Sequence, residues 1–117
     1  MEPKVAVDLI KNVEVPVCLN LALCYIKTEK YHYAIKYCSQ VLDKNFPPEQ
    51  IQGGVGSIEK ALYRRGTSYF KIGDLKKAKA DFLRANEVVE EAQKTDPSIK
   101  KSPVVAQALR DLRSKVE

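Results

Sequence analysis

The sequence predicts an all-α fold, a right-handed solenoid of helical hairpins closed by a C-terminal helix. The chain repeats itself at an offset of 44 residues, and its apolar residues recur at helical spacing. Most glycines and prolines, which end helices, fall between these periodic stretches. We expect one domain, because 117 residues with 44% hydrophobic and 30% charged content suit a single globular core.

The two copies of the repeat place residues of like size on each other. Ala22 falls on Gly66, and Tyr25 falls on Tyr69. A small residue lets two antiparallel helices approach closely, and a tyrosine three positions later fills the space beside them. The other aligned pairs are Asn20 with Arg64, Leu21 with Arg65, Lys27 with Lys71, Tyr31 with Leu75, Ala34 with Ala78, Cys38 with Phe82 and Val41 with Ala85.

Each copy of the repeat carries the same short motif. The first copy reads NLAxxY from residue 20, and the second reads YRRGxxY from residue 63. This motif resembles the tetratricopeptide repeat over about residues 15 to 92, and the resemblance implies a module that binds other proteins. The later positions of the motif are filled by Ala34 and Cys38 in the first copy and by Gly73, Ala78, Phe82 and Ala85 in the second.

A loop is expected between the two copies. Repeats of this family span about 34 residues, so an offset of 44 demands an insertion of about ten. Residues 45–57, which read NFPPEQIQGGVGS, supply this insertion. Two prolines and three glycines deny the segment a regular helix, and we predict that it forms the connection between the hairpins.

Chain breakers and capping residues set the remaining boundaries. Gly73 and Asp74 make the turn of the second hairpin, as a helix-ending glycine and an N-capping carboxylate. Thr95-Asp96-Pro97 ends the fourth helix, and a capping Ser102 with Pro103 begins the closing helix. The hairpin helices are expected over residues 15–28, 31–44, 58–72 and 75–94.

These boundaries divide the single domain, residues 1–117, into five parts: 1–14 as a partial N-terminal repeat helix, 15–48 as a repeat, 45–57 as a loop insertion, 58–94 as a repeat and 102–117 as a capping helix. The first and last parts have apolar faces at helical spacing. A closing helix is needed to cover the last exposed surface of a repeat array. The apolar positions are Val5, Leu9, Ile10 and Val13 at the start and Val104, Val105, Ala108, Leu109, Leu112 and Val116 at the end.

Two cations and an amide are the candidate binding residues. Lys60 and Arg64 are four residues apart and therefore lie on one face of a first helix, which lines the concave groove in hairpins of this kind. By the offset of 44, Asn20 occupies the place of Arg64 in the first copy, so the three side chains should face one another. An amide donor and two cations make a carboxylate receptor, because charge-assisted hydrogen bonds are strong.

The same residues resemble a subgroup of the family. Residues 19–22 and 59–66 are similar to the second and third repeats of the co-chaperone modules in large immunophilins of the FK506-binding-protein type. This resemblance implies binding of the C-terminal Glu-Glu-Val-Asp peptide of cytosolic heat-shock protein 90 or 70, with Asn20, Lys60 and Arg64 holding carboxylates. The family's clamp also draws a lysine and an asparagine from a preceding repeat. Lys4, Lys11 and Asn12 do not reproduce that motif, so the clamp is partial.

Further side chains are expected along the groove. Tyr63 and Phe70 are candidates to hold an apolar side chain of a bound peptide, as aromatic anchors commonly do. Packing against neighbouring helices is the alternative for both residues. The full set of predicted groove-lining residues is Leu23, Ile26 and Lys27 in the first copy and Tyr63, Thr67, Phe70 and Lys71 in the second.

Enzymatic, metal and nucleic-acid functions are disfavoured. One histidine, no phosphate-binding glycine loop and no nucleophile beside a base argue against catalysis, and a prolyl isomerase domain of an immunophilin would lie outside these residues. No cofactor or metal is expected, because the three cysteines and the histidine match no zinc-ligand spacing and suit buried positions. The clustered lysines and arginines alternate with acids, unlike a nucleic-acid-binding stripe.

The cellular location and the assembly state are predicted from the apolar runs, the cysteines and the net charge of the chain. No apolar run approaches the roughly 20 residues of a membrane span, and a cytosolic location with reduced thiols is expected. The net charge of +5 favours acidic partners. A different hypothesis is a scaffold or self-association module, in which the incomplete N-terminal repeat leaves an apolar surface for a second copy of the chain.

Overall fold

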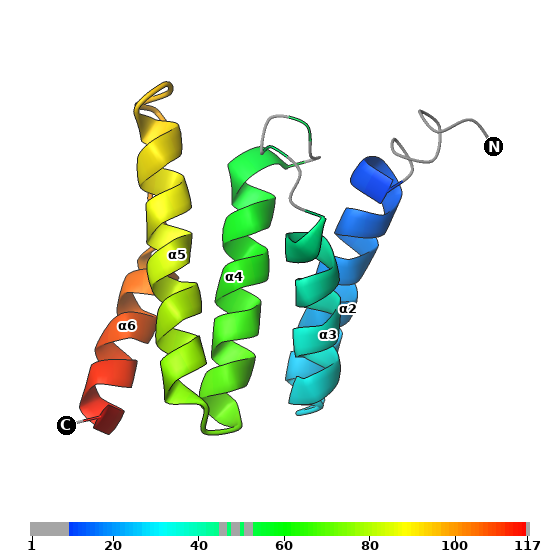
Figure 1. The fold of residues 1–117 in the computed structure, drawn as a ribbon, viewed down its shortest axis with the longest axis vertical. Coiled ribbons are helices and arrows are strands. Elements are labelled where there is room, and N and C mark those ends of the chain that lie inside the picture. The colour runs from blue at the N-terminus through cyan, green and yellow to red at the C-terminus, as the bar shows by residue number, and fades with distance from the viewer. Residues whose placement is uncertain (1–9, 45–46, 48–49, 51–52, 117) are drawn as a thin grey trace.

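The computed structural model describes residues 10–44, 47, 50 and 53–116 (Figure 1). These residues contain helices and no strand, so the all-α prediction is confirmed. A π-helical turn and five α-helices follow one another: η1 (Ile10–Glu14), α2 (Val15–Lys27), α3 (Tyr31–Asp43), α4 (Gly54–Lys71), α5 (Leu75–Gln93) and α6 (Pro103–Val116).

The helices form two antiparallel hairpins, α2 with α3 and α4 with α5, and α3 packs on α4 to join them (Figure 1). Helix α6 packs against α5 at the C-terminal end of the array, where the sequence predicts a closing helix. The result is an elongated layer of helices, 52 × 35 × 19 Å in extent. Its first helices, α2 and α4, are in contact along one side.

The small residues of the repeat allow the close approach that their positions predict. Ala22 is fully buried with Ala34 and Cys38, and the Tyr25 ring packs against them. A Cβ atom at Gly66 would lie 2.7 Å from Cε1 of Phe82, so no larger residue fits without movement of the ring. Both contacts confirm the interpretation of the motif as two packed antiparallel helices.

The turn of the second hairpin is built as its sequence predicts. Gly73 has a φ angle of 90°, a left-handed conformation that glycine adopts without the penalty of a Cβ atom. Asp74 then caps α5, because its carboxylate accepts a hydrogen bond from the backbone N–H of Lys77 at 3.2 Å. The helix starts at the next residue, Leu75.

Helix α4 begins at Gly54, four residues before the predicted start at Ile58. The glycines of the insertion were expected to prevent helix there, and for Gly54 to Ser57 this prediction is wrong. Ser57 is buried and Ile58 packs against core residues from both hairpins, so tertiary packing outweighs the weak helix propensity of glycine. Apart from Pro47, Gln50 and Gly53, the rest of the predicted loop lies outside the described residues.

The N-terminal segment differs from the predicted separate helix. Residues 10–14 form a π turn that runs into α2 without a break, because Glu14 already has helical backbone angles. Val13 is 53% exposed, because α2 meets the rest of the molecule through Val15 and Leu19 instead. Val5 and Leu9 lie outside the described residues.

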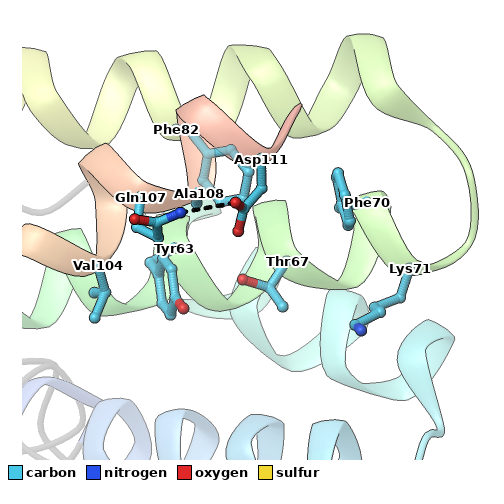
Figure 2. A pocket seen from close by; sticks show the side chains of 9 residues that line it. All are labelled: Tyr63, Thr67, Phe70, Lys71, Phe82, Val104, Gln107, Ala108 and Asp111. Carbon is cyan, nitrogen blue, oxygen red and sulfur yellow. Dashed lines mark hydrogen bonds between the residues drawn. The ribbon is translucent and has the colours of Figure 1, made fainter. Parts of the chain in front are cut away.

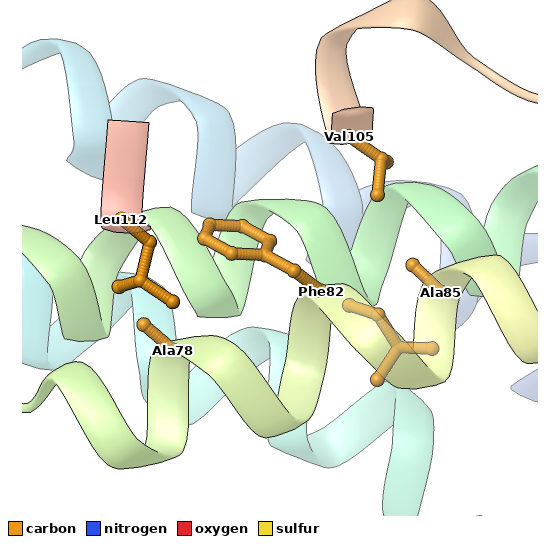
Figure 3. Packing of buried hydrophobic residues seen from close by; sticks show 6 residues of the cluster. Ala78, Phe82, Ala85, Val105 and Leu112 are labelled. Atoms are coloured by element: carbon orange, nitrogen blue, oxygen red, sulfur yellow. The ribbon is translucent and has the colours of Figure 1, made fainter. Parts of the chain in front are cut away.

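The closing helix buries most of the apolar face that the sequence predicts. Val105 and Leu112 are buried against α5, and Figure 3 shows them around the Phe82 ring. Val104 is 47% exposed, contrary to the prediction, because the next residue along the helix takes the inward position. The carboxylate of Glu59 in α4 accepts a hydrogen bond from the backbone N–H of Ser102, which fixes the start of α6 beside α4.

Candidate functional site

Arg64 connects the two hairpins on the side of the first helices. Its Nη1 donates a hydrogen bond of 2.7 Å to the backbone carbonyl oxygen of Leu19 in α2. Asn20 is the next residue, so the guanidinium group is held at the turn of α2 that carries the predicted amide donor. A guanidinium group has five N–H donors, and among the described residues Arg64 uses only Nη1, in the bond to Leu19.

Lys60 and Asn20 have their polar groups available for a ligand. Lys60 precedes Arg64 by one helical turn in α4, and both Lys60 and Asn20 are exposed. Within the described part of the chain, neither side chain makes a hydrogen bond or an ion pair. Arg64 is therefore held by a hydrogen bond within the fold, whereas the ammonium group of Lys60 and the amide group of Asn20 are exposed.

A cavity of about 220 Å³ lies between α4 and α6 (Figure 2). Tyr63, Thr67 and Lys71 extend from α4 toward the same side, as their spacing along one helix face requires. The four residues predicted for the second half of the groove, which include Phe70, thus line one cavity. Phe82 of α5 completes the wall, and its ring lies 6.0 Å from that of Tyr63 between centroids.

Helix α6 supplies the opposite wall, which the sequence analysis did not assign to the groove. Gln107 donates a 2.8 Å hydrogen bond from Nε2 to the carboxylate of Asp111, one turn further along the helix. Val104 and Ala108 complete this wall. The signal was present in the sequence, because positions 104, 107, 108 and 111 share one face of a helix.

The predicted groove residues of the first hairpin lie apart from this cavity. Lys27 is exposed at the end of α2, and Leu23 is half-buried. Ile26 packs against the cluster of Ala22, Ala34 and Cys38 and so contributes to the core of the first hairpin. Any contact of Leu23 and Lys27 with a ligand stays a prediction.

A second arginine, Arg65, stabilises the frame behind the site. Its Nε and Nη2 donate two hydrogen bonds of 2.8 Å to the carboxylate of Asp81, and its Nη1 donates to Ser39 at 3.2 Å. The pair joins α4 to α5 and α3, and Asp81 is buried. The hydrogen bonds to Asp81 raise the pKa of Arg65. The repeat alignment placed this arginine opposite Leu21 and gave no indication of the pair.

The three cysteines differ in burial. Burial raises the pKa of the Cys38 thiol to about 12 and also raises the pKa of Cys18, whose Sγ donates to the side-chain oxygen of Gln40. Cys24 is exposed, contrary to the prediction that all three cysteines occupy the core. Among the described residues, no three histidine, cysteine or acidic side chains gather closely enough to hold a metal ion.

The fold and the site together define a class of protein. Stacked helical hairpins with cationic, amide and aromatic side chains along the first helices form a repeat module for protein interaction. The family model described as "Tetratricopeptide repeat" matches residues 15–43 and 59–97, which is more than half of the chain. The chain therefore belongs to the tetratricopeptide repeat family.

Curated relatives match over part of their length. The chain is 32% identical to Peptidyl-prolyl cis-trans isomerase FKBP4 of Homo sapiens over 66 residues, 56% of this chain and 12% of that protein. It is 33% identical to Outer envelope protein 61 of Arabidopsis thaliana over 98 residues, 84% of this chain and 14% of that protein. The chain thus spans about an eighth of the length of these relatives. No solved structure matches the chain.

None of the helices in the described residues is both long enough and apolar enough to cross a membrane.

Proposed function

We propose that this module binds the acidic C-terminal Glu-Glu-Val-Asp peptide of cytosolic heat-shock protein 90 or 70 through Asn20, Lys60 and Arg64. The observation that carries the proposal is the hydrogen bond from Arg64 to the carbonyl of Leu19. It joins the predicted cation of α4 to the residue beside the predicted amide of α2. In this role Asn20 donates to the terminal carboxylate, and Lys60 and Arg64 bind carboxylates.

Electrostatics favour a peptide of this kind. The chain carries a net charge of +5, and the three proposed binding side chains are all hydrogen-bond donors. Lys60 has no acidic partner among the described residues, so a peptide carboxylate would not have to displace one. Binding of a cytosolic chaperone would place the module in the cytosol as part of a larger co-chaperone.

Similarity to known proteins supports the proposal from a separate direction. The chain resembles Peptidyl-prolyl cis-trans isomerase FKBP4 over 66 residues, 56% of its length. The match covers 12% of that protein, so its isomerase activity is not carried over to these residues. We propose a non-catalytic role in which the chain recognises a peptide and leaves its covalent structure unchanged.

The test is a calorimetric titration with a free-acid peptide ending in Met-Glu-Glu-Val-Asp. Replacing Lys60 or Asn20 by alanine should weaken binding by about tenfold each, because each change removes a hydrogen bond to a charged group. The matched control is Lys79→Ala, which removes an exposed lysine from α5 outside the site and should leave affinity unchanged. Equal losses in Lys60→Ala and Lys79→Ala would show a general charge effect and contradict the proposal.

A second candidate function, self-association, is favoured by one observation. Val13 and Val17 are 53% and 49% exposed and lie four residues apart, so they form an apolar strip at the N-terminal edge of α2. We propose that a second copy of this chain packs against this strip. Light scattering at rising concentration tests it, since association abolished by Val17→Lys would support it and a monomer at all concentrations would exclude it.

A further inference from the structure

Two hairpin turns and the end of α6 share one edge of the molecule, the lower edge in Figure 1. The exposed cations at these helix ends form what we call the basic edge: Lys27, Lys30, Lys71, Lys76, Arg113 and Lys115. We propose that the basic edge docks on the surface of an anionic lipid bilayer and that Ile72 enters the headgroup region beside the lysines.

Few acidic groups neutralise the basic edge. Within the described part of the chain, none of its six cations makes an ion pair. The acids of the two turns are Glu29 and Asp74, and the carboxylate of Asp74 is already engaged as the cap of α5. Further along α6, the carboxylate of Asp111 accepts a hydrogen bond from Gln107. At the opposite edge, lysines are paired with acids, as in Lys44 with Glu14 and Lys101 with Glu90.

Helix dipoles explain only part of this charge. Lys27 and Lys71 lie in the last turns of α2 and α4, where the dipole favours a cation. Lys30 is the N-cap residue of α3 and Lys76 lies in the first turn of α5, where the dipole disfavours a cation. Neither of these two side chains makes a hydrogen bond or an ion pair among the described residues. Their positions therefore indicate an anionic partner outside the chain.

Ile72 gives the basic edge an apolar tip. It follows Lys71 in the turn between α4 and α5, and its side chain is 40% exposed. The repeat does not require an apolar residue there, because the equivalent position in the first hairpin is Thr28. The hydroxyl of Thr28 lies 3.1 and 3.2 Å from two backbone carbonyl oxygens. An apolar side chain beside lysines favours a bilayer over a nucleic acid, since a phosphate backbone offers it no apolar partner.

A flat anionic surface suits a row of helix ends. The attraction of a charged bilayer fades within a Debye length, about 8 to 10 Å at physiological salt, so cations along one edge reach it together. Charge attraction and one inserted side chain then act as two signals for reversible binding. Docking of this kind does not depend on the proposed peptide site. Lys60 lies about three turns of α4 away from the basic edge, so the groove would stay open on a docked molecule.

The test is co-sedimentation of the unmodified chain with vesicles. Vesicles of phosphatidylcholine with about 30% phosphatidylserine should bind the chain at about 0.1 M salt, and vesicles of phosphatidylcholine alone should not. Raising the salt to about 0.5 M should release the chain, because screening shortens the reach of the charges. Equal binding to both kinds of vesicle, or binding to neither, would overturn the proposal.

A double charge reversal locates the surface. Lys30→Glu with Lys76→Glu should weaken binding to the phosphatidylserine vesicles by at least about tenfold, since two cations near the bilayer become anions. The matched control is Lys94→Glu with Lys100→Glu, which changes the charge equally at exposed, unpaired lysines of the opposite edge. Equal losses in the two double variants would show a general charge effect and overturn the assignment to the basic edge. Circular dichroism checks that both variants are folded.

Replacing the apolar tip separates a bilayer from a nucleic acid. Ile72→Ser leaves the charge unchanged and should weaken vesicle binding by about fivefold. Leu83→Ser is the matched control, because Leu83 is 43% exposed on α5 away from the edge, and it should bind as the unmodified chain does. Unchanged binding of Ile72→Ser would overturn the insertion of Ile72. Binding of polyuridylate that is weakened by the Lys30 and Lys76 reversals, without binding to vesicles, would assign the basic edge to nucleic acid and overturn the proposal.

Discussion

The two hairpins have the same backbone turns but different side chains behind them. In the first, the backbone N–H groups of Glu29 and Lys30 donate to the carbonyls of Ile26 and Tyr25. In the second, the residues 44 positions later make the same two hydrogen bonds, at distances within 0.1 Å of those in the first. The backbone of a hairpin is therefore specified by few positions, and the other positions are left to vary.

The side chains at the varying positions give the two hairpins different cores. Cys38 in the first core corresponds to Phe82 in the second, where the ring also forms a wall of the α4–α6 cavity. Leu21 corresponds to Arg65, and Tyr37 corresponds to Asp81. The first hairpin fills its space with stacked tyrosines, whereas the second fixes its helices with an ion pair. The cations of the proposed clamp, Lys60 and Arg64, lie on the hairpin that carries this ion pair.

The largest expected loss of stability comes from replacing Arg65 by leucine, which is the residue at the equivalent position 21 of the first hairpin. Arg65→Leu should destabilise the protein by about 3 kcal/mol, because it leaves the buried Asp81 carboxylate unpaired. Urea unfolding followed by circular dichroism measures the change. Adding Asp81→Leu to Arg65→Leu should recover most of the loss, and a double variant as unstable as the single one would show that the hydrogen bonds themselves carry the stability.

A smaller loss of stability is expected at position 66, where the second hairpin has glycine and the first has the equivalent Ala22. Gly66→Ala should destabilise the protein by about 1 to 2 kcal/mol, since the new Cβ would come within 2.7 Å of the buried Phe82 ring, which would have to shift. Calorimetric melting of this variant measures the cost. Combining it with Phe82→Leu should reduce the penalty, and no change from that combination would contradict the role given to the ring.

Substitutions in the two turns should change the free energy of unfolding by about 1 kcal/mol each, with opposite signs. Glu29 has a φ angle of 62°, where glycine is favoured, so Glu29→Gly should stabilise the protein. Gly73→Ala should destabilise it by a similar amount, because the φ angle of 90° is strained for alanine although no atom lies within 4 Å of its Cβ. The unfolding midpoints of the two variants measure these changes. Shifts of both midpoints in the same direction would contradict the structural equivalence of the two turns.

The smallest effect concerns local opening of the first hairpin, which contains all three cysteines. At pH 8, exposed Cys24 should react with a thiol reagent at least about tenfold faster than Cys38, whose thiol has a pKa of about 12 and is buried. Mass spectrometry of partly labelled protein measures the rates. Labelling of Cys38 as fast as Cys24 would show that the first hairpin opens freely, and Glu29→Gly should slow any such labelling.

The sequence predicted the parts of the fold that depend on local pattern. The repeat offset identified both hairpins, and Asp74 was recognised as a cap because carboxylate capping acts within one helical turn. The start of α4 at Gly54 was missed, since burial of Ser57 and Ile58 depends on contacts between hairpins. A propensity scale cannot contain those contacts.

The residues of the candidate site on α4 could be predicted from the sequence, but those on α6 could not. Tyr63 and Thr67 share a helix face with Lys71, and that relation follows from their spacing. Asp111 joins them only because α6 packs back against α4 and α5, which is a tertiary fact. The ion pair of Arg65 with Asp81 could not be predicted for the same reason, because the two residues lie sixteen positions apart on two helices.

Recognition of a C-terminal carboxylate by the first helices is tested by comparing two forms of one peptide. The unmodified protein is titrated with a peptide ending in Met-Glu-Glu-Val-Asp as the free acid and, in parallel, with the same peptide amidated at its C-terminus. Carboxylate recognition predicts saturable binding of the acid and a loss of at least about tenfold on amidation, which removes the terminal charge. Equal affinity for both peptides, or no binding of either, would contradict it.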